Sequence, residues 1–243
     1  MLGKLRERYQ RMMMPMGRKL AKTGITPNAI TILSLLVALL SACFFYLGEL
    51  LIGLGLMVLA IVMDMFDGAV ARAANMISKF GATLDHTLDR YAEFLFILGL
   101  MMGPAGAVSI PWWPLEPGDR FVPWFWGVFA LFGMVMASFT RAKAESVGGM
   151  KSCAVGIAER QEKMMLIIAG VLLIALPPAN VWMYLLGFLP NTVAQVFVSI
   201  EVTNILTLVM VIVGILSHVT VVQRLAYARK VIRASEQGNP PLG

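Results

Sequence analysis

Two aspartates, a glycine and an arginine stand close together in an otherwise apolar stretch, D-M-F-D-G-A-V-A-R, which begins at position 64. On a helix, Asp64, Asp67, Gly68 and Ala71 fall within an arc of about 100°, because successive residues turn by ~100°. Arg72 follows about one turn beyond Asp67, and its guanidinium group is suited to binding a phosphate. Two carboxylates are therefore expected to flank a strip of small residues on one helix face.

A second polar stripe follows in G-A-T-L-D-H-T-L-D, where Gly81, Asp85 and Asp89 are spaced by four. If the two stripes face each other, four carboxylates surround one cavity, and at membrane depth they must be protonated or hold cations. A site made only of carboxylates suits Mg²⁺, Mn²⁺ or Ca²⁺ rather than zinc. Gly68 and Gly81 leave room for a nucleotide to approach the backbone. The alternative is an ion-pair network between two helices, in which Arg72 alone would have to neutralise four aspartates.

The composition predicts an all-α integral membrane protein, since 58% of the residues are hydrophobic, 14% are charged and the mean hydropathy is +0.77. Each predicted span is close to the ~20 residues that a bilayer requires. The six expected transmembrane helices are Asn28–Leu47, Leu50–Arg72, Lys79–Met102, Val122–Lys143, Lys163–Pro178 and Val198–Val221. We expect them to form one domain over residues 27–226, followed by a cytoplasmic tail over residues 227–243.

Basic residues indicate the orientation of the chain. They gather before the first span, between the second and third, between the fourth and fifth, and after the sixth, whereas the other three connections contain only Arg120. The positive-inside rule then places both termini, and the aspartate motif, on the cytoplasmic side of the cell membrane. In residues 1–26, apolar residues recur at roughly helical spacing between basic ones, which predicts a juxtamembrane amphipathic helix lying on anionic lipid.

The spacing D-x2-D-G-x2-A-R-x8-G-x3-D-x3-D resembles the signature of the CDP-alcohol phosphotransferases, enzymes that join a CDP-linked lipid to an alcohol and release CMP. The resemblance implies that Asp64, Asp67 and Asp85 bind Mg²⁺ or Mn²⁺. It gives Asp89 the role of general base, and Asp89 is also a candidate ligand of a second metal ion. The residues expected to bind the CDP-lipid are Asn28, Ala29, Ile30, Thr31, Gly68, Arg72, Ser78 and Gly81.

Three segments of the second half, A-x-A-E-S-x-G, I-A-E-R and V-Q-R-L, resemble the phosphatidylinositol-phosphate and archaetidylinositol-phosphate synthases. In that branch, basic residues hold the phosphate of inositol 1-phosphate, and the matching positions here are Arg141, Lys143, Arg160 and Arg224. Four cations at one mouth favour a phosphorylated acceptor over serine, choline or ethanolamine. The alternative for each cation is ordinary positive-inside topology.

The predicted reaction is therefore transfer of a phosphatidyl or archaetidyl group to inositol 1-phosphate by direct attack. The donor is CDP-diacylglycerol or CDP-archaeol, because either pair of tails would meet only an apolar groove. The resemblance also implies a homodimer, and no nucleic-acid partner is expected. An alternative within the family is glycerol 3-phosphate as acceptor, which gives phosphatidylglycerophosphate. A divalent-cation transporter would also gather intramembrane aspartates, but it leaves the glycine and arginine spacing without a reason.

Overall fold

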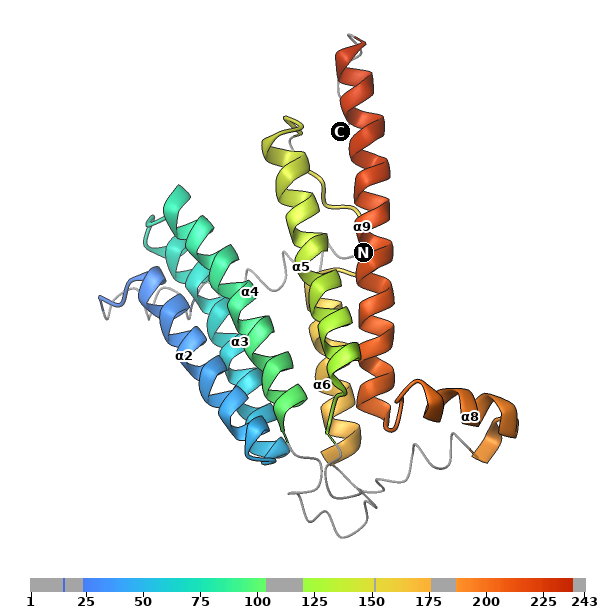
Figure 1. Cartoon of the computed structure of the whole chain (residues 1–243). Coiled ribbons are helices and arrows are strands. Elements are labelled where there is room, and N and C mark those ends of the chain that lie inside the picture. The colour runs from blue at the N-terminus through green and yellow to red at the C-terminus, as the bar shows by residue number, and fades with distance from the viewer. Residues whose placement is uncertain (1–14, 16–23, 104–119, 151, 176–186, 238–243) are drawn as a thin grey trace. The chain divides into compact units, whose positions relative to one another are not determined.

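The computed structural model describes residues 15, 24–103, 120–150, 152–175 and 187–237. The seven elements of secondary structure that these residues form are all helices (Figure 1). The chain divides into two compact units, residues 1–103 and residues 104–243. The helices are α2 (Pro27–Tyr46), α3 (Leu50–Ala73) and α4 (Lys79–Met102) in the first unit, and α5 (Trp124–Ser146), α6 (Arg160–Ala175), α8 (Asn191–Ser199) and α9 (Ile205–Glu236) in the second.

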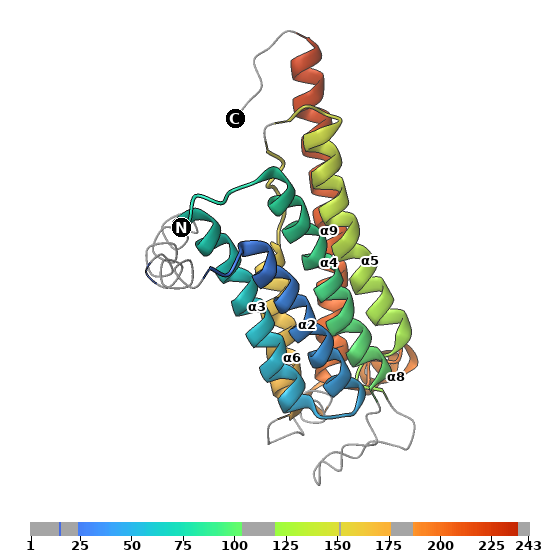
Figure 2. The same cartoon turned by 90° about the vertical axis from the view of Figure 1, so that its left-hand side faces the viewer.

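Short connections determine the arrangement of the first unit. The Thr26 side chain caps α2 by accepting a hydrogen bond from the Ala29 amide, and Gly48, at φ 87°, turns the chain into α3. Asn75, at φ 54°, lies in the next turn, and the Ser78 hydroxyl caps α4 by accepting from the Gly81 amide at 2.9 Å. Successive helices are therefore antiparallel, so the start of α2, the end of α3 and the start of α4 share one end of the unit (Figures 1 and 2).

Helix α2 packs along both α3 and α4, and small residues allow the close approach. A Cβ atom added to Gly99 would lie 2.7 Å from the Ala42 carbonyl oxygen, and one added to Gly53 would lie 2.5 Å from the Phe45 ring. The buried Ser41 hydroxyl donates to the Gly53 carbonyl at 2.7 Å, which satisfies a polar group between two apolar helices. This packing fixes how α3 and α4 present their polar stripes.

In the second unit, α5 and α6 both pack against α9 (Figure 2). Small residues again stand at the contacts: a Cβ atom on Gly133 would lie 2.9 Å from the Ser217 Cβ atom. Asn204 caps α9, because its Oδ1 atom accepts from the Thr207 amide at 2.8 Å. Its side-chain amide also donates to the Phe121 carbonyl at 3.1 Å, which ties the start of α9 to the residues before α5.

The predicted helix ends are close to the observed ones except in the last span, and the end predicted at Pro178 lies outside the described residues. The third predicted span, Lys79–Met102, has the same bounds as α4, and the second ends one residue short of Ala73. The start predicted at Val198 is wrong, because that residue belongs to α8, which turns away from α9 in Figure 1. Glu201, at φ 59°, lies in the break between the two helices. The predicted end at Val221 falls inside α9, which continues to Glu236.

Among the helices that the structure describes, four are long and apolar enough to cross a membrane: α2, α3, α5 and α9. They carry large apolar side chains on their outer surfaces, for example Leu36, Phe132 and Val222, as lipid-facing helices do. The protein is thus an all-helical, multi-pass membrane protein. Helix α4 is as long as α3 but carries a series of charged residues, and α6 is described only as far as Ala175. Apart from residues 15 and 24–26, the predicted amphipathic segment lies outside the described residues.

Candidate functional site

Three of the predicted aspartates form one cluster. Asp64 and Asp67 come from α3 and Asp85 from α4, and one carboxylate oxygen of each lies within 4.8 Å of the others. Oxygen ligands at ~2.0–2.6 Å from a divalent ion are separated by about these distances, so the donor set fits Mg²⁺ or Mn²⁺. Asp67 is buried, whereas Asp64 and Asp85 are half-buried, which leaves one side of the cluster accessible. For these three residues, the prediction that the two stripes face each other is confirmed.

Thr31, on α2, contacts this cluster through Asp67. Its hydroxyl group, which is buried, donates a hydrogen bond of 2.6 Å to Asp67 Oδ2. A hydrogen bond to a ligating carboxylate fixes its orientation, and such partners tune metal affinity. The sequence placed Thr31 among the CDP-lipid residues, whereas its contact in the structure is with a predicted metal ligand. No spacing rule could have found that contact, because the two residues stand 36 positions apart on different helices.

Asn28, Ser78 and Gly81 meet at the shared end of the first unit. A Cβ atom on Gly81 would lie 2.9 Å from the Ser78 hydroxyl oxygen and 3.2 Å from Asn28 Oδ1. The small residue therefore leaves a gap bordered by two polar side chains. Of the other predicted residues in this segment, Ile30 is buried in the core and Ala29 is exposed.

Gly68 and Arg72 lie one turn apart on α3, and the arginine folds back over the glycine. A Cβ atom on Gly68 would lie 3.3 Å from Arg72 Nη1. Gly68 thus makes room for the guanidinium group of Arg72. The cation stands on the helix that carries Asp64 and Asp67, where it can bind a phosphate group.

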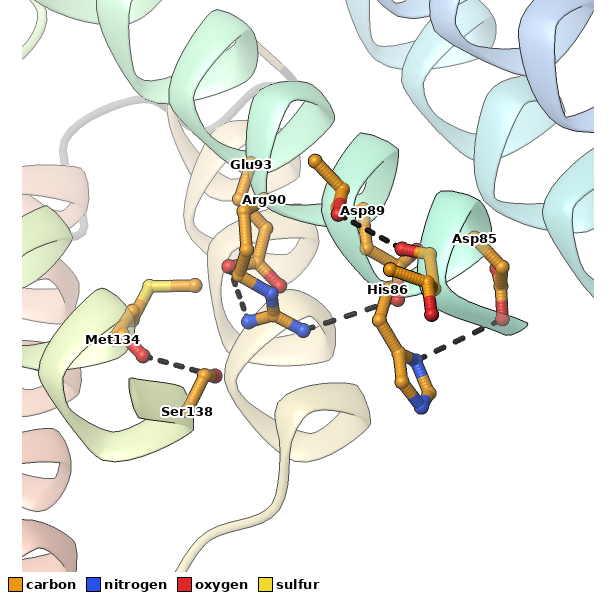
Figure 3. A network of polar contacts seen from close by, with 9 residues as sticks. Asp85, His86, Asp89, Arg90, Glu93, Met134 and Ser138 are labelled. Carbon is orange, nitrogen blue, oxygen red and sulfur yellow. Dashed lines mark hydrogen bonds and ion pairs between the residues drawn. The ribbon is translucent and has the colours of Figure 1, made fainter. Parts of the chain in front are cut away.

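Asp89 follows Asp85 by one turn of α4, outside the cluster of three carboxylates, and is buried. Two residues not predicted from the sequence, Arg90 and Glu93, lie beside it. Arg90 Nη2 is 3.8 Å from Asp89 Oδ2, and Arg90 Nη1 donates a hydrogen bond of 2.8 Å to Glu93 Oε2. Figure 3 shows the Arg90 guanidinium group between the two carboxylates. A charged pair three residues apart in an apolar helix was the available signal. His86 is largely exposed and points toward Asp85 at 3.8 Å.

The second unit contains the residues predicted to bind the acceptor, and Glu145 contacts one of them, Arg141. Arg141 Nε donates to Glu145 Oε1 at 2.9 Å, and the same oxygen accepts from the Cys153 amide at 2.9 Å. The carboxylate therefore joins the end of α5 to the connection that precedes α6. Burial raises the pKa of the Cys153 thiol above its ordinary value, so the thiol is held in its neutral form.

Arg224 holds the same connection from α9. Its Nε atom donates to the Val155 carbonyl at 2.8 Å and its Nη1 atom to the Ala137 carbonyl. Gln223 adds a contact, because its side-chain oxygen accepts from the Ile157 amide at 2.9 Å. The Arg224 charge also interacts unfavourably with that of Arg141, so the structure brings these two cations together.

Lys143 takes a different direction. It stands two residues after Arg141, or ~200° around α5, and its ammonium group lies 5.8 Å from the centre of the Phe139 ring. Arg160 is the first residue of α6. The structure therefore groups Arg141 with Arg224 but places Lys143 on another side of α5.

The model of the family described as CDP-alcohol phosphatidyltransferase matches residues 24–191. This range is more than half of the chain and contains the aspartate motif. The chain therefore belongs to this family and is a CDP-alcohol phosphotransferase, a membrane transferase of phospholipid synthesis.

Among its curated relatives is the archaetidylinositol phosphate synthase of Pyrococcus horikoshii, which is 33% identical over 172 residues, 71% of this chain and 82% of that protein. The phosphatidylinositol phosphate synthase of Streptomyces avermitilis is 28% identical over 200 residues, 77% of this chain and 78% of that protein. Both relatives take their names from inositol phosphate products.

The crystal structure of Mycobacterium tuberculosis phosphatidylinositol phosphate synthase with CDP-DAG bound is similar, with a TM-score of 0.65 and 26% identity over 90% of this chain and 94% of that one. The structure of the same protein with manganese and citrate has a TM-score of 0.65 and 25% identity, and covers 89% of this chain and 88% of that one. The relative thus binds manganese, an ion that the aspartate cluster described above fits.

Proposed function

We propose that the enzyme transfers a phosphatidyl or archaetidyl group from a CDP-linked lipid to inositol 1-phosphate and releases CMP. The observation that supports the reaction class best is the cluster of Asp64, Asp67 and Asp85, whose oxygens lie within 4.8 Å of one another. The acceptor and donor are supported by relatives whose names specify archaetidylinositol phosphate and phosphatidylinositol phosphate.

In this proposal, a hydroxyl group of inositol 1-phosphate attacks the phosphorus that carries the lipid. A new P–O bond forms to the acceptor, the P–O bond to the CMP phosphate breaks, and CMP leaves with the bond electrons. Asp89 accepts the proton of the attacking hydroxyl. Bound Mg²⁺ or Mn²⁺, expected as two ions, supplies positive charge against the pyrophosphate.

The remaining roles belong to the chain's own side chains. Arg72 donates to the pyrophosphate, and the gap at Gly81, bordered by Asn28 and Ser78, receives the nucleotide. Thr31 keeps Asp67 oriented. The phosphate of the acceptor is bound by basic residues of the second unit, Arg141, Arg160 and Arg224. Lys143, the fourth predicted residue, lies on another side of α5 and is left out of this role.

We also propose that six helices cross the membrane, with α4 and α6 added to the four apolar ones, and that residues 1–26 lie on the lipid surface. Both termini and the site would face the cytoplasm, following the distribution of basic residues. The functional form would be a homodimer in which residues 27–226 of each chain form the six-helix domain and residues 227–243 form its cytoplasmic extension.

The decisive experiment is a headgroup screen on the purified protein. CDP-diacylglycerol and CDP-archaeol are each offered with inositol 1-phosphate, free inositol or glycerol 3-phosphate, and CMP release is measured with Mg²⁺, Mn²⁺ or EDTA. We expect release only with metal and inositol 1-phosphate. Preference for glycerol 3-phosphate would instead make the enzyme a phosphatidylglycerophosphate synthase. Metal uptake without CMP release from any pair would favour a transporter.

Asp89→Asn tests the base. We expect kcat to fall by ~10²–10⁴, the usual contribution of a general base, while metal and CDP-lipid still bind. If calorimetry shows that the variant has lost both ligands, Asp89 is a metal ligand first and its role as the base is unsupported.

A further inference from the structure

The buried pair of Arg90 and Glu93 stands directly after the residue that we propose as the base. Glu93 has no exposed side-chain surface, and its Oε2 atom accepts a hydrogen bond of 2.8 Å from Arg90 Nη1. On the other side of the guanidinium group, Arg90 Nη2 lies 3.8 Å from Asp89 Oδ2 (Figure 3). All three residues belong to α4.

The two distances differ in kind. A length of 2.8 Å is that of a charge-assisted hydrogen bond, whereas 3.8 Å is too long for a hydrogen bond although the opposite charges still attract. Arg90 can reach either carboxylate, because both lie within one turn of it. A buried carboxylate such as Glu93 strongly requires a partner, which favours the contact observed.

We propose that Glu93 is a positioning residue that acts through Arg90. It holds the guanidinium group away from hydrogen-bond distance of Asp89, so that the Asp89 carboxylate can receive the acceptor hydroxyl group. Without Glu93, Arg90 would turn to Asp89 and bind it directly. The inference rests on the proposed function, in which Asp89 takes the proton from the acceptor.

A purely structural role makes a different prediction. If the pair only stabilises α4, replacing Glu93 lowers the stability of the fold. Replacing Arg90 as well then does not restore turnover. If Glu93 restrains Arg90, removing the arginine from the Glu93 variant removes the group that would capture Asp89. The second substitution should then restore turnover.

The experiment compares Glu93→Gln, the double variant Arg90→Gln/Glu93→Gln, Asp89→Asn and the wild type. For Glu93→Gln we expect kcat to fall about 10-fold, less than for Asp89→Asn, with the KM for CDP-lipid and the Kd for Mn²⁺ within about twofold of wild type. The double variant should recover most of the lost kcat. Glu236→Gln, at an exposed position near the end of α9, is the matched control and should have wild-type kcat.

The outcomes separate the two hypotheses. Wild-type kcat in Asp89→Asn would refute the proposed base and this inference together. A slow Asp89→Asn with wild-type kcat in Glu93→Gln would refute only the inference, as would a double variant no faster than Glu93→Gln. If Glu93→Gln does not fold, the double variant decides, because it removes both charges of the Arg90–Glu93 pair. A kcat within about fivefold of wild type supports the proposal, and a kcat at the level of Asp89→Asn overturns it.

Discussion

Removing the Thr31 hydroxyl group should weaken metal binding without reshaping the site. Thr31→Val keeps the volume of the side chain but leaves Asp67 Oδ2 without a donor at 2.6 Å. Both side chains are buried, so water does not readily replace the lost bond. A hydrogen bond to a charged group contributes ~1.5–3 kcal/mol, which corresponds to a ~10–150-fold increase in Kd. The lower part of this range agrees with the ~10–100-fold effect of losing a group that orients a metal ligand.

The assay is titration of the purified variant with Mn²⁺, followed by calorimetry or by the spin resonance signal of the free ion. Thr31→Ser keeps the hydroxyl group and should bind Mn²⁺ as the wild type does. Ser41→Ala is the matched control, because it removes another buried hydrogen bond of α2, to Gly53, far along the helix from the aspartates. A wild-type Kd in Thr31→Val, or an equal loss in Ser41→Ala, would refute the reasoning.

Three further predictions test other parts of the chain. Gly81→Ala should displace the Ser78 hydroxyl and raise the KM for CDP-lipid about 10-fold, which is the equivalent of one hydrogen bond. Gly55→Ala is the control: a Cβ atom there meets nothing within 4 Å, so this variant should leave the KM for CDP-lipid unchanged. Burial raises the pKa of the Cys153 thiol, so at about pH 8 this thiol should react with iodoacetamide at least ~10-fold more slowly in the folded protein than after unfolding in SDS. Equal rates of alkylation, measured by mass spectrometry, would contradict this. Arg160→Gln should raise the KM for inositol 1-phosphate by ~10–150-fold and leave that for CDP-lipid near wild type, and the reverse pattern in initial rates would place Arg160 elsewhere.

The aspartate cluster could be predicted because it depends on local geometry. Residues three or four apart share a helix face, which brings Asp64 and Asp67 together on α3. The connection between α3 and α4 is short, so the next stripe returns along the same end of the unit and Asp85 joins them. Spacing and chain reversal were enough to predict the cluster, and the packing of α2 along both helices holds the two stripes in place.

The contacts that escaped prediction depend on packing or on single side chains. Thr31 meets Asp67 only because α2 packs along α3. The hydropathy of the chain runs on through Val198 and Val202, so the break before α9 was not visible; it depends on the Asn204 cap and the left-handed backbone at Glu201. A window of hydropathy averages over such side chains, and the predicted last span therefore began too early.

The directions of the basic side chains also could not be predicted from their positions in the sequence alone. The family resemblance predicts that Arg141 and Lys143 bind the same phosphate, but two positions on a helix turn by ~200°. The structure directs Arg141 toward Glu145 and Lys143 toward Phe139. Glu145 was the missing signal, since a carboxylate four residues after an arginine predicts the side on which that arginine lies.

The first unit separates two kinds of chemistry along its helices. The clustered carboxylates stand inside α3 and α4, where the backbone amides are engaged in the helices and the side chains alone can bind a cation. The groups suited to a pyrophosphate stand at helix ends: Arg72 in the last turn of α3, and Asn28 and Ser78 at the starts of α2 and α4. Helix N-termini and arginine attract anions, whereas buried carboxylates repel them until a cation is bound. The order of these groups along the helices therefore favours a cation among the clustered carboxylates and an anion at the shared end of the three helices.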